Sequence, residues 1–193
     1  MNHFTLILSI WFIVSLILGY SGLLGKISPP FHQIILLCIV ITLIISFFRF
    51  KNFKKWTLSL SLRTLISVHI IRFIGFYFLF LYSKGQLPYE FAVPAGIGDI
   101  VIAISALYII SNYTAERGVR ITAVLIWNLF GLADIMFVIF TAARLMFSAP
   151  DSMIALTELP LSTLITFFVP LIIYSHLVIF YVINRSRRSK VYE

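Results

Sequence analysis

The sequence predicts an all-α fold, a polytopic bundle of six transmembrane helices. The chain of 193 residues is 61% hydrophobic and only 11% charged, whereas soluble domains have about 25% charged residues. Several apolar runs reach the roughly 20 residues that a helix needs to cross a hydrocarbon core of about 30 Å. Low charge and long apolar runs together indicate an integral membrane protein with one transmembrane domain, residues 1–193.

The spans follow from the apolar runs. The first run lacks a basic n-region and a small-residue cleavage site, so we interpret it as a retained helix and not as a signal peptide. The fourth span is expected to begin at Pro94, because proline is favoured in the first turn of a helix. The expected spans are Phe4–Leu24, Phe31–Phe50, Leu62–Tyr82, Pro94–Tyr113, Ile121–Thr141 and Pro160–Val182.

The basic residues predict the orientation. If the N-terminus is cytoplasmic, residues 49–63, 113–120 and 184–193 are cytoplasmic too, and they contain 11 of the 15 Lys and Arg residues. Only Lys26, Lys84 and Arg144 fall on the other side. Because cytoplasmic flanks of spans are rich in Lys and Arg, both termini are expected to be cytoplasmic. The net charge of +8 is thus explained by the basic flanks of the spans. The expected partner is the lipid bilayer, and nucleic-acid binding is not expected.

Charged residues inside the spans give the first candidate site. Ionisable side chains in hydrocarbon usually face the bundle interior and pair. Arg72 is expected about 15 Å and Asp99 about 8 Å below the outer boundary, so Arg72 can pair with Asp99, Asp134 or both. Two carboxylates against one arginine leave an acid over. Either Arg144 turns inward to neutralise it, or one aspartate binds a proton or a cation.

Three further polar residues lie within the spans. His69 and His176 are expected at similar depth on different helices, which is what axial ligation of a b-type haem requires, and Asn128 belongs to the same polar set. No third and fourth ligand accompanies the histidines, so no metal site is predicted. The single cysteine, Cys38, permits neither an intramolecular disulfide nor a thiolate site. Haem b is therefore the one cofactor that the residues suggest.

A proline and a glycine-containing stretch within the spans also affect the interpretation. Pro170 should kink the sixth span and free the carbonyl of Thr166. The GIGD stretch that ends at Asp99 is not a dinucleotide fingerprint, because no strand precedes it. P-loop, HExxH and GxSxG motifs are missing from the sequence, so no catalytic residue is identified and a non-enzymatic protein is favoured.

Three motifs together resemble a known group of proteins. LPYEFAVPAGIGD (Leu87–Asp99), WNLFGLAD (Trp127–Asp134) and VPLIIYSH (Val169–His176) are similar to small bacterial integral membrane proteins of unassigned function. The resemblance covers about residues 69–176 and does not involve the first two spans. It implies a multi-span protein of the bacterial inner membrane, and it implies no activity.

Three functions therefore remain open from the sequence. The first is a carrier, channel or sensor that binds a small solute, proton or ion at Arg72, Asp99 and Asp134. The second is a redox protein with haem between His69 and His176. In the third, the polar residues only hold helices together.

Overall fold

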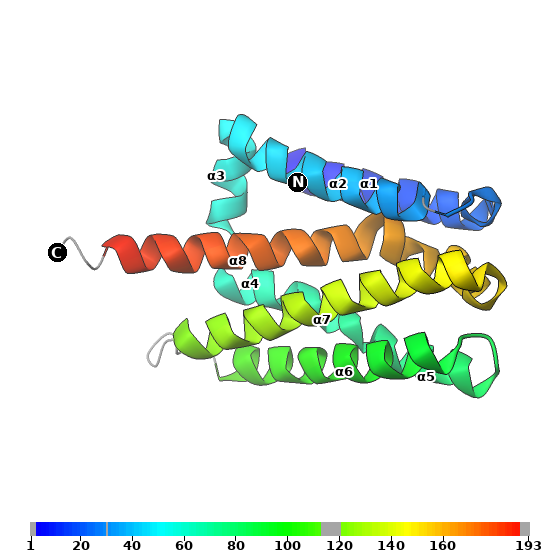
Figure 1. Ribbon diagram of the computed structural model, residues 1–193. Coiled ribbons are helices and arrows are strands. Elements are labelled where there is room, and N and C mark those ends of the chain that lie inside the picture. Colours follow the sequence, from blue (N-terminus) through cyan, green and yellow to red (C-terminus); the bar gives the residue numbers. More distant parts are fainter. Residues whose placement is uncertain (1–2, 30, 113–120, 190–193) are drawn as a thin grey trace.

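The computed structural model describes residues 3–29, 31–112 and 121–189, and these ranges are helical and contain no strand (Figure 1). The α-helices are α1 (His3–Tyr20), α2 (Phe31–Arg49), α3 (Lys51–Ser59), α4 (Leu62–Ser67), α5 (Gly75–Ser83), α6 (Tyr89–Ser111), α7 (Ile121–Ser148) and α8 (Val169–Ser189). Between them lie the 3-10 helices η1 (Leu24–Lys26), η2 (Val68–Ile74) and η3 (Pro150–Thr157), and the π-helical segment η4 (Leu164–Phe168).

Six helical stretches of the described chain are long and apolar enough to cross a membrane, as the sequence predicts. Two of them are composite. The third stretch, Leu62–Ser83, consists of α4, η2 and α5, and the sixth, Leu164–Arg185, consists of η4 and most of α8. A membrane helix tolerates such 3-10 and π segments where neighbouring helices and side chains satisfy the displaced backbone groups.

The predicted start of the fourth span at Pro94 is wrong. Helix α6 begins at Tyr89, and Pro94 lies inside it. The additional turn contains Phe91 and Ala92, which are both buried in the core. Pro94 has no N–H, so the carbonyl of Glu90 lacks its helical donor. Burial of the first turn thus outweighs a single lost hydrogen bond.

The helices differ in how much of them the bundle covers. Helix α8 runs through the middle of the bundle (Figure 1), and the apolar stretch Leu164–Arg185 that contains most of it is far more buried than α1. Helix α1 is therefore peripheral. The short helix α3 crosses the others at one end, where the C-terminal end of α8 also lies, and η1 and η3 lie at the opposite end (Figure 1).

The irregular segment before α8 explains how α1 is attached. Pro170 has no N–H for the carbonyl of Thr166, and the indole N–H of Trp11 on α1 donates to that carbonyl over 2.9 Å. The hydroxyl of Thr166 donates to the carbonyl of Ser162, so the Ser15 hydroxyl donates to Thr166 over 2.5 Å. The carbonyl that the sequence predicted to be freed therefore receives a donor from another helix.

Candidate functional site

The 3-10 segment η2 places Arg72 inside the bundle. In a 3-10 helix, residues three apart lie directly above one another, so His69, Arg72 and Gly75 share one face. All three are buried. Ile70, by contrast, is 36% exposed on the outer surface. The segment therefore turns two polar side chains toward α6, α7 and α8 and keeps an apolar side chain on the lipid-facing side.

A glycine contact brings α6 close to this face. A Cβ atom added to Gly75 would overlap the carbonyl oxygen of Gly96 and lie 3.1 Å from the Cβ of Asp99. Only because both positions are glycine can α5 and α6 approach this closely. Ten residues separate Tyr89 from Asp99, so Asp99 lies about 15 Å from the start of α6. Asp99 is thus deeper in its helix than the sequence suggested and level with Arg72.

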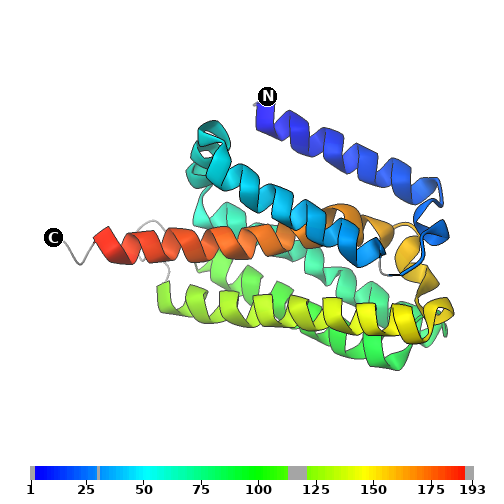
Figure 2. The same cartoon turned by 45° about the horizontal axis from the view of Figure 1, so that its top comes forward.

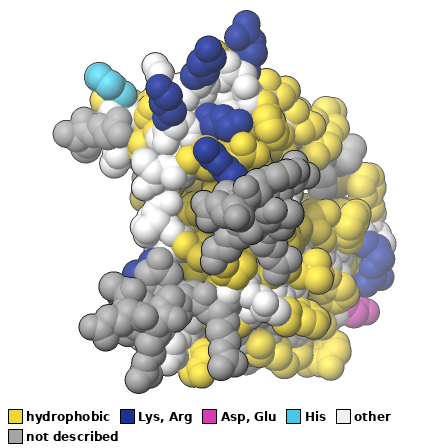
Figure 3. All heavy atoms as spheres, turned by 90° about the vertical axis from the view of Figure 1, so that its left-hand side faces the viewer, with side chains coloured by type: hydrophobic (Ala, Val, Ile, Leu, Met, Phe, Trp, Pro, Cys, Tyr) yellow, Lys and Arg dark blue, Asp and Glu magenta, His cyan; other side chains and the backbone are white. Residues whose placement is uncertain are grey.

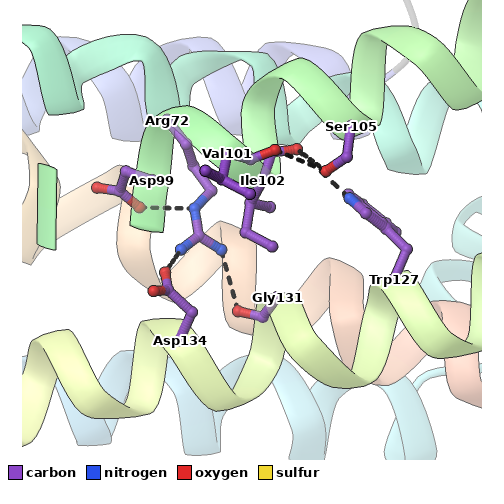
Figure 4. Close-up of polar contacts among 8 residues, drawn as sticks. All are labelled: Arg72, Asp99, Val101, Ile102, Ser105, Trp127, Gly131 and Asp134. Carbon is purple, nitrogen blue, oxygen red and sulfur yellow. Dashed lines mark hydrogen bonds and ion pairs between the residues drawn. The ribbon is translucent and has the colours of Figure 1, made fainter. Parts of the chain in front are cut away.

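The guanidinium of Arg72 contacts three acceptors (Figure 4). Its Nε donates to Oδ1 of Asp99 over 2.6 Å, and its Nη2 forms an ion pair with Oδ2 of Asp134. Its Nη1 donates to the carbonyl of Gly131 over 3.0 Å. We call Arg72, Asp99 and Asp134 the arginine cluster. The structure brings these three predicted residues together. It adds the carbonyl of Gly131, a backbone group that the pattern of side chains does not indicate.

Asp134 is the accessible member of the arginine cluster. The side chains of Arg72 and Asp99 are 1% and 5% exposed, and that of Asp134 is 20% exposed. A Cβ atom added to Gly98 would overlap the carboxylate of Asp134, so Gly98 provides the space for this group. Arg144 is exposed, and in the described part of the chain it forms no ion pair. With both aspartates ionised, the cluster has a formal charge of −1.

The two histidines form a second polar group with residues of α7 and α8. Oδ1 of Asn128 contacts Nδ1 of His176 over 2.8 Å, and the amide of Asn128 donates to the His176 carbonyl. This fixes Asn128 Oδ1 as acceptor, so His176 donates from Nδ1. Ser175 donates its proton to the carbonyl of Ile172, so His69 donates to Ser175 from Nε2 over 2.8 Å. We call His69, Asn128, Ser175 and His176 the histidine cluster.

The histidine cluster does not fit a haem. The imidazole rings of His69 and His176 have centroids 4.2 Å apart. Metal–imidazole bonds are about 2 Å long, so two rings on opposite faces of one iron have their nitrogens about 4 Å apart and their centroids farther. The ring of Trp127 lies 4.9 Å from that of His69, and both histidines are fully buried. No space for a porphyrin remains between the rings.

Consecutive residues of α8 link it to three other elements. Tyr174 contacts Thr57 of α3 over 2.9 Å, Ser175 contacts His69, and His176 contacts Asn128. Of these three residues, only His176 was predicted as a site residue. Tyr174 and Ser175 were not, although three adjacent polar residues in an apolar span indicate a polar contact. Within the described ranges, no group of three or more His, Cys, Asp or Glu residues is arranged to hold a metal ion.

Six apolar helices around a buried arginine–carboxylate cluster fit the class of polytopic helical membrane proteins. The chain belongs to a family of unassigned function, described as domain of unknown function DUF8737, whose model matches residues 29–184. The match includes α2, which the resemblance seen in the sequence did not cover, and it leaves α1 outside. No curated protein and no solved structure matches the chain.

Proposed function

We propose that the protein is a membrane carrier or sensor that binds a proton or a small cation at the arginine cluster. The observation that supports this most directly is the ratio of two carboxylates to one guanidinium in the bundle interior. A formal negative charge in a low-dielectric interior is costly unless another charge compensates it. A bound proton or cation would provide that compensation, because Arg144 does not.

The partial exposure of Asp134 supports the same proposal. A binding group must be reachable, and the side chain of Asp134 is four times as exposed as that of Asp99, 20% against 5%. The fixed donors of Arg72 hold one oxygen of each carboxylate, so the remaining oxygens are available as ligands. Hard cations such as Na⁺ and Ca²⁺ prefer oxygen ligands. Asp134 is therefore the entry point and Asp99 the deeper partner.

The test is titration calorimetry of the purified protein in detergent with Na⁺, Li⁺ and Ca²⁺ at acidic and alkaline pH. Asp99→Asn and Asp134→Asn keep an acceptor oxygen for Arg72 and remove one negative charge each. Both should abolish the binding heat and its dependence on pH. Asp151→Asn is the matched control, because Asp151 is an exposed carboxylate on η3 and its loss should change nothing.

The alternative is a structural role for the arginine cluster. It is favoured by one observation: all three guanidinium nitrogens of Arg72 have an acceptor within the protein. If the wild type binds no cation and takes up no proton, while both Asn variants unfold at lower temperature, the cluster only holds η2, α6 and α7 together. That result would refute the proposed function.

We also propose the orientation and location of the chain. The uneven distribution of Lys and Arg supports cytoplasmic termini, and α3, with its three lysines, lies at the same end of the bundle as the end of α8 (Figure 1). The resemblance of the three motifs to bacterial proteins supports a bacterial inner membrane. The whole chain would act there as a single transmembrane domain.

A further inference from the structure

Residues of α1, α2 and α3 line a groove. Figure 2 shows the course of α1 and of α2, which leads into α3 at one end of the bundle. The volume of the groove is about 590 Å³, and it is open on one side. Phe4 closes its end by stacking on Trp56 of α3, with ring centroids 5.2 Å apart. The groove is lined by Phe4, Ile7, Thr42, Leu43, Ser46, Arg49, Phe50, Lys51, Asn52 and Phe53.

The basic residues of the lining lie at one end of a groove that is otherwise mostly apolar. Arg49, Lys51 and Asn52 lie at the junction of α2 and α3. Ile7 and Leu43 lie farther from that junction, along α1 and α2. Seven residues separate Thr42 from Arg49, so the groove extends about 10 Å along α2 from its basic end. This combination of a cationic end and an apolar slot matches a molecule with an anionic head and a hydrocarbon chain.

The segment that contains Arg49 and Lys51 is strongly basic. Residues 49–63 contain five basic residues and no acidic residue. Figure 3 shows Lys and Arg side chains gathered on one part of this end of the molecule. Arg49 and Lys51 are exposed and, as far as the chain is described, in no ion pair. Lys54 differs, because its ammonium lies over the rings of Phe47, Phe48 and Tyr181 at 5.1 to 5.7 Å.

We propose that this groove binds an anionic phospholipid, with the phosphate between Arg49 and Lys51 and one acyl chain along Ile7 and Leu43. Basic pockets between transmembrane helices bind anionic headgroups in this way. The first turn of α3, which has no side-chain cap, adds the positive end of its helix dipole at the same place. The site is separate from the arginine cluster and does not depend on the function proposed for it.

The test uses the full chain in detergent and counts bound lipid by native mass spectrometry, with dioleoyl-phosphatidylglycerol and dioleoyl-phosphatidylcholine as probes. The wild type should prefer the anionic lipid. Arg49→Gln with Lys51→Gln should reduce that preference about 30-fold, since each of the two basic residues contributes about 1 kcal/mol. Lys55→Gln with Arg63→Gln is the matched control, because it removes two exposed charges of the same stretch outside the groove.

A second pair of variants tests the apolar half without a change of charge. Ile7→Trp fills the slot and should release the bound lipid, whereas Ile10→Trp, equally exposed on α1 but outside the groove, should retain it. Equal losses in both charge variants, or no loss in either, would overturn the proposal. Competition by inorganic phosphate at the same concentration as the lipid would also overturn it, because the occupant would then be a free anion.

Discussion

Arg72 is the residue on which the interior depends most. Its guanidinium links η2 to α6 through Asp99 and to α7 through Asp134 and Gly131. A lysine or a methionine cannot contact all three acceptors, because only the planar guanidinium presents several donors in fixed directions. A single side chain therefore links three spans.

Replacement of Arg72 by methionine should destabilise the protein by about 3 kcal/mol, because two buried carboxylates lose their common partner. Thermal unfolding in detergent, followed by circular dichroism, measures the loss. Adding Asp99→Asn and Asp134→Asn to Arg72→Met should recover part of the stability, because the uncompensated charges are removed. An Arg72→Met protein as stable as the wild type would contradict the prediction.

Gly98 allows a second prediction at the same scale. Alanine in a helix is usually more stable than glycine by about 0.5–1 kcal/mol. Here the sign should reverse, because the new Cβ would overlap the carboxylate of Asp134 and displace it from Arg72. Gly98→Ala should lower the melting temperature in the wild-type background and raise it in an Asp134→Ala background. The double-mutant cycle detects this coupling, and additive effects would argue against the close contact.

At the scale of elements, the sequence predicts which segments are helical better than it predicts where they bend or begin. Hydrophobicity and length are enough to find the six apolar helices. The 3-10 segment η2 and the π segment η4 depend on neighbours distant in the sequence, such as Trp11 for Thr166. The similar depth of His69 and His176 was predictable from the sequence. That their rings touch was not, because this depends on how each helix is rotated about its own axis.

Helix α1 lies outside the matched family region and is attached through few contacts, so its docking should be sensitive to a single bond. Trp11→Phe keeps an aromatic ring against Phe167 and removes the N–H that serves Thr166. The lost hydrogen bond is worth about 0.5–1.5 kcal/mol, so amides of α1 should exchange roughly two- to tenfold faster by hydrogen–deuterium exchange.

The control for this prediction is Trp56→Phe. Its ring stacks on Phe4, and no described acceptor receives a hydrogen bond from its indole, so the same substitution should leave exchange in α1 nearly unchanged. If Trp11→Phe leaves the exchange of α1 at the wild-type rate, the indole bond does not hold this helix.

For the whole molecule, the two ends of the bundle differ in charge, and this difference predicts how it lies in the membrane. Segment 49–63 contains Arg49, Lys51, Lys54, Lys55 and Arg63 without an acid, whereas the α5–α6 connection contains Lys84 alone. Positive loops remain cytoplasmic during insertion. The predicted orientation depends only on where Lys and Arg lie in the sequence, so composition is enough to predict it. The pairing of Arg72 with the two aspartates was also predictable, but its bond to the carbonyl of Gly131 depends on how the helices pack.

Cysteine labelling in spheroplasts measures that orientation. In a Cys38→Ser background, which removes the only native thiol, Lys84→Cys should react with a membrane-impermeant maleimide from outside. Lys55→Cys should react only after the membrane is opened, because it lies on the basic side. Both positions are exposed, so reactivity reports the side and not burial. Labelling of Lys55→Cys from outside, with Lys84→Cys protected, would invert the chain and place the lipid groove in the other leaflet.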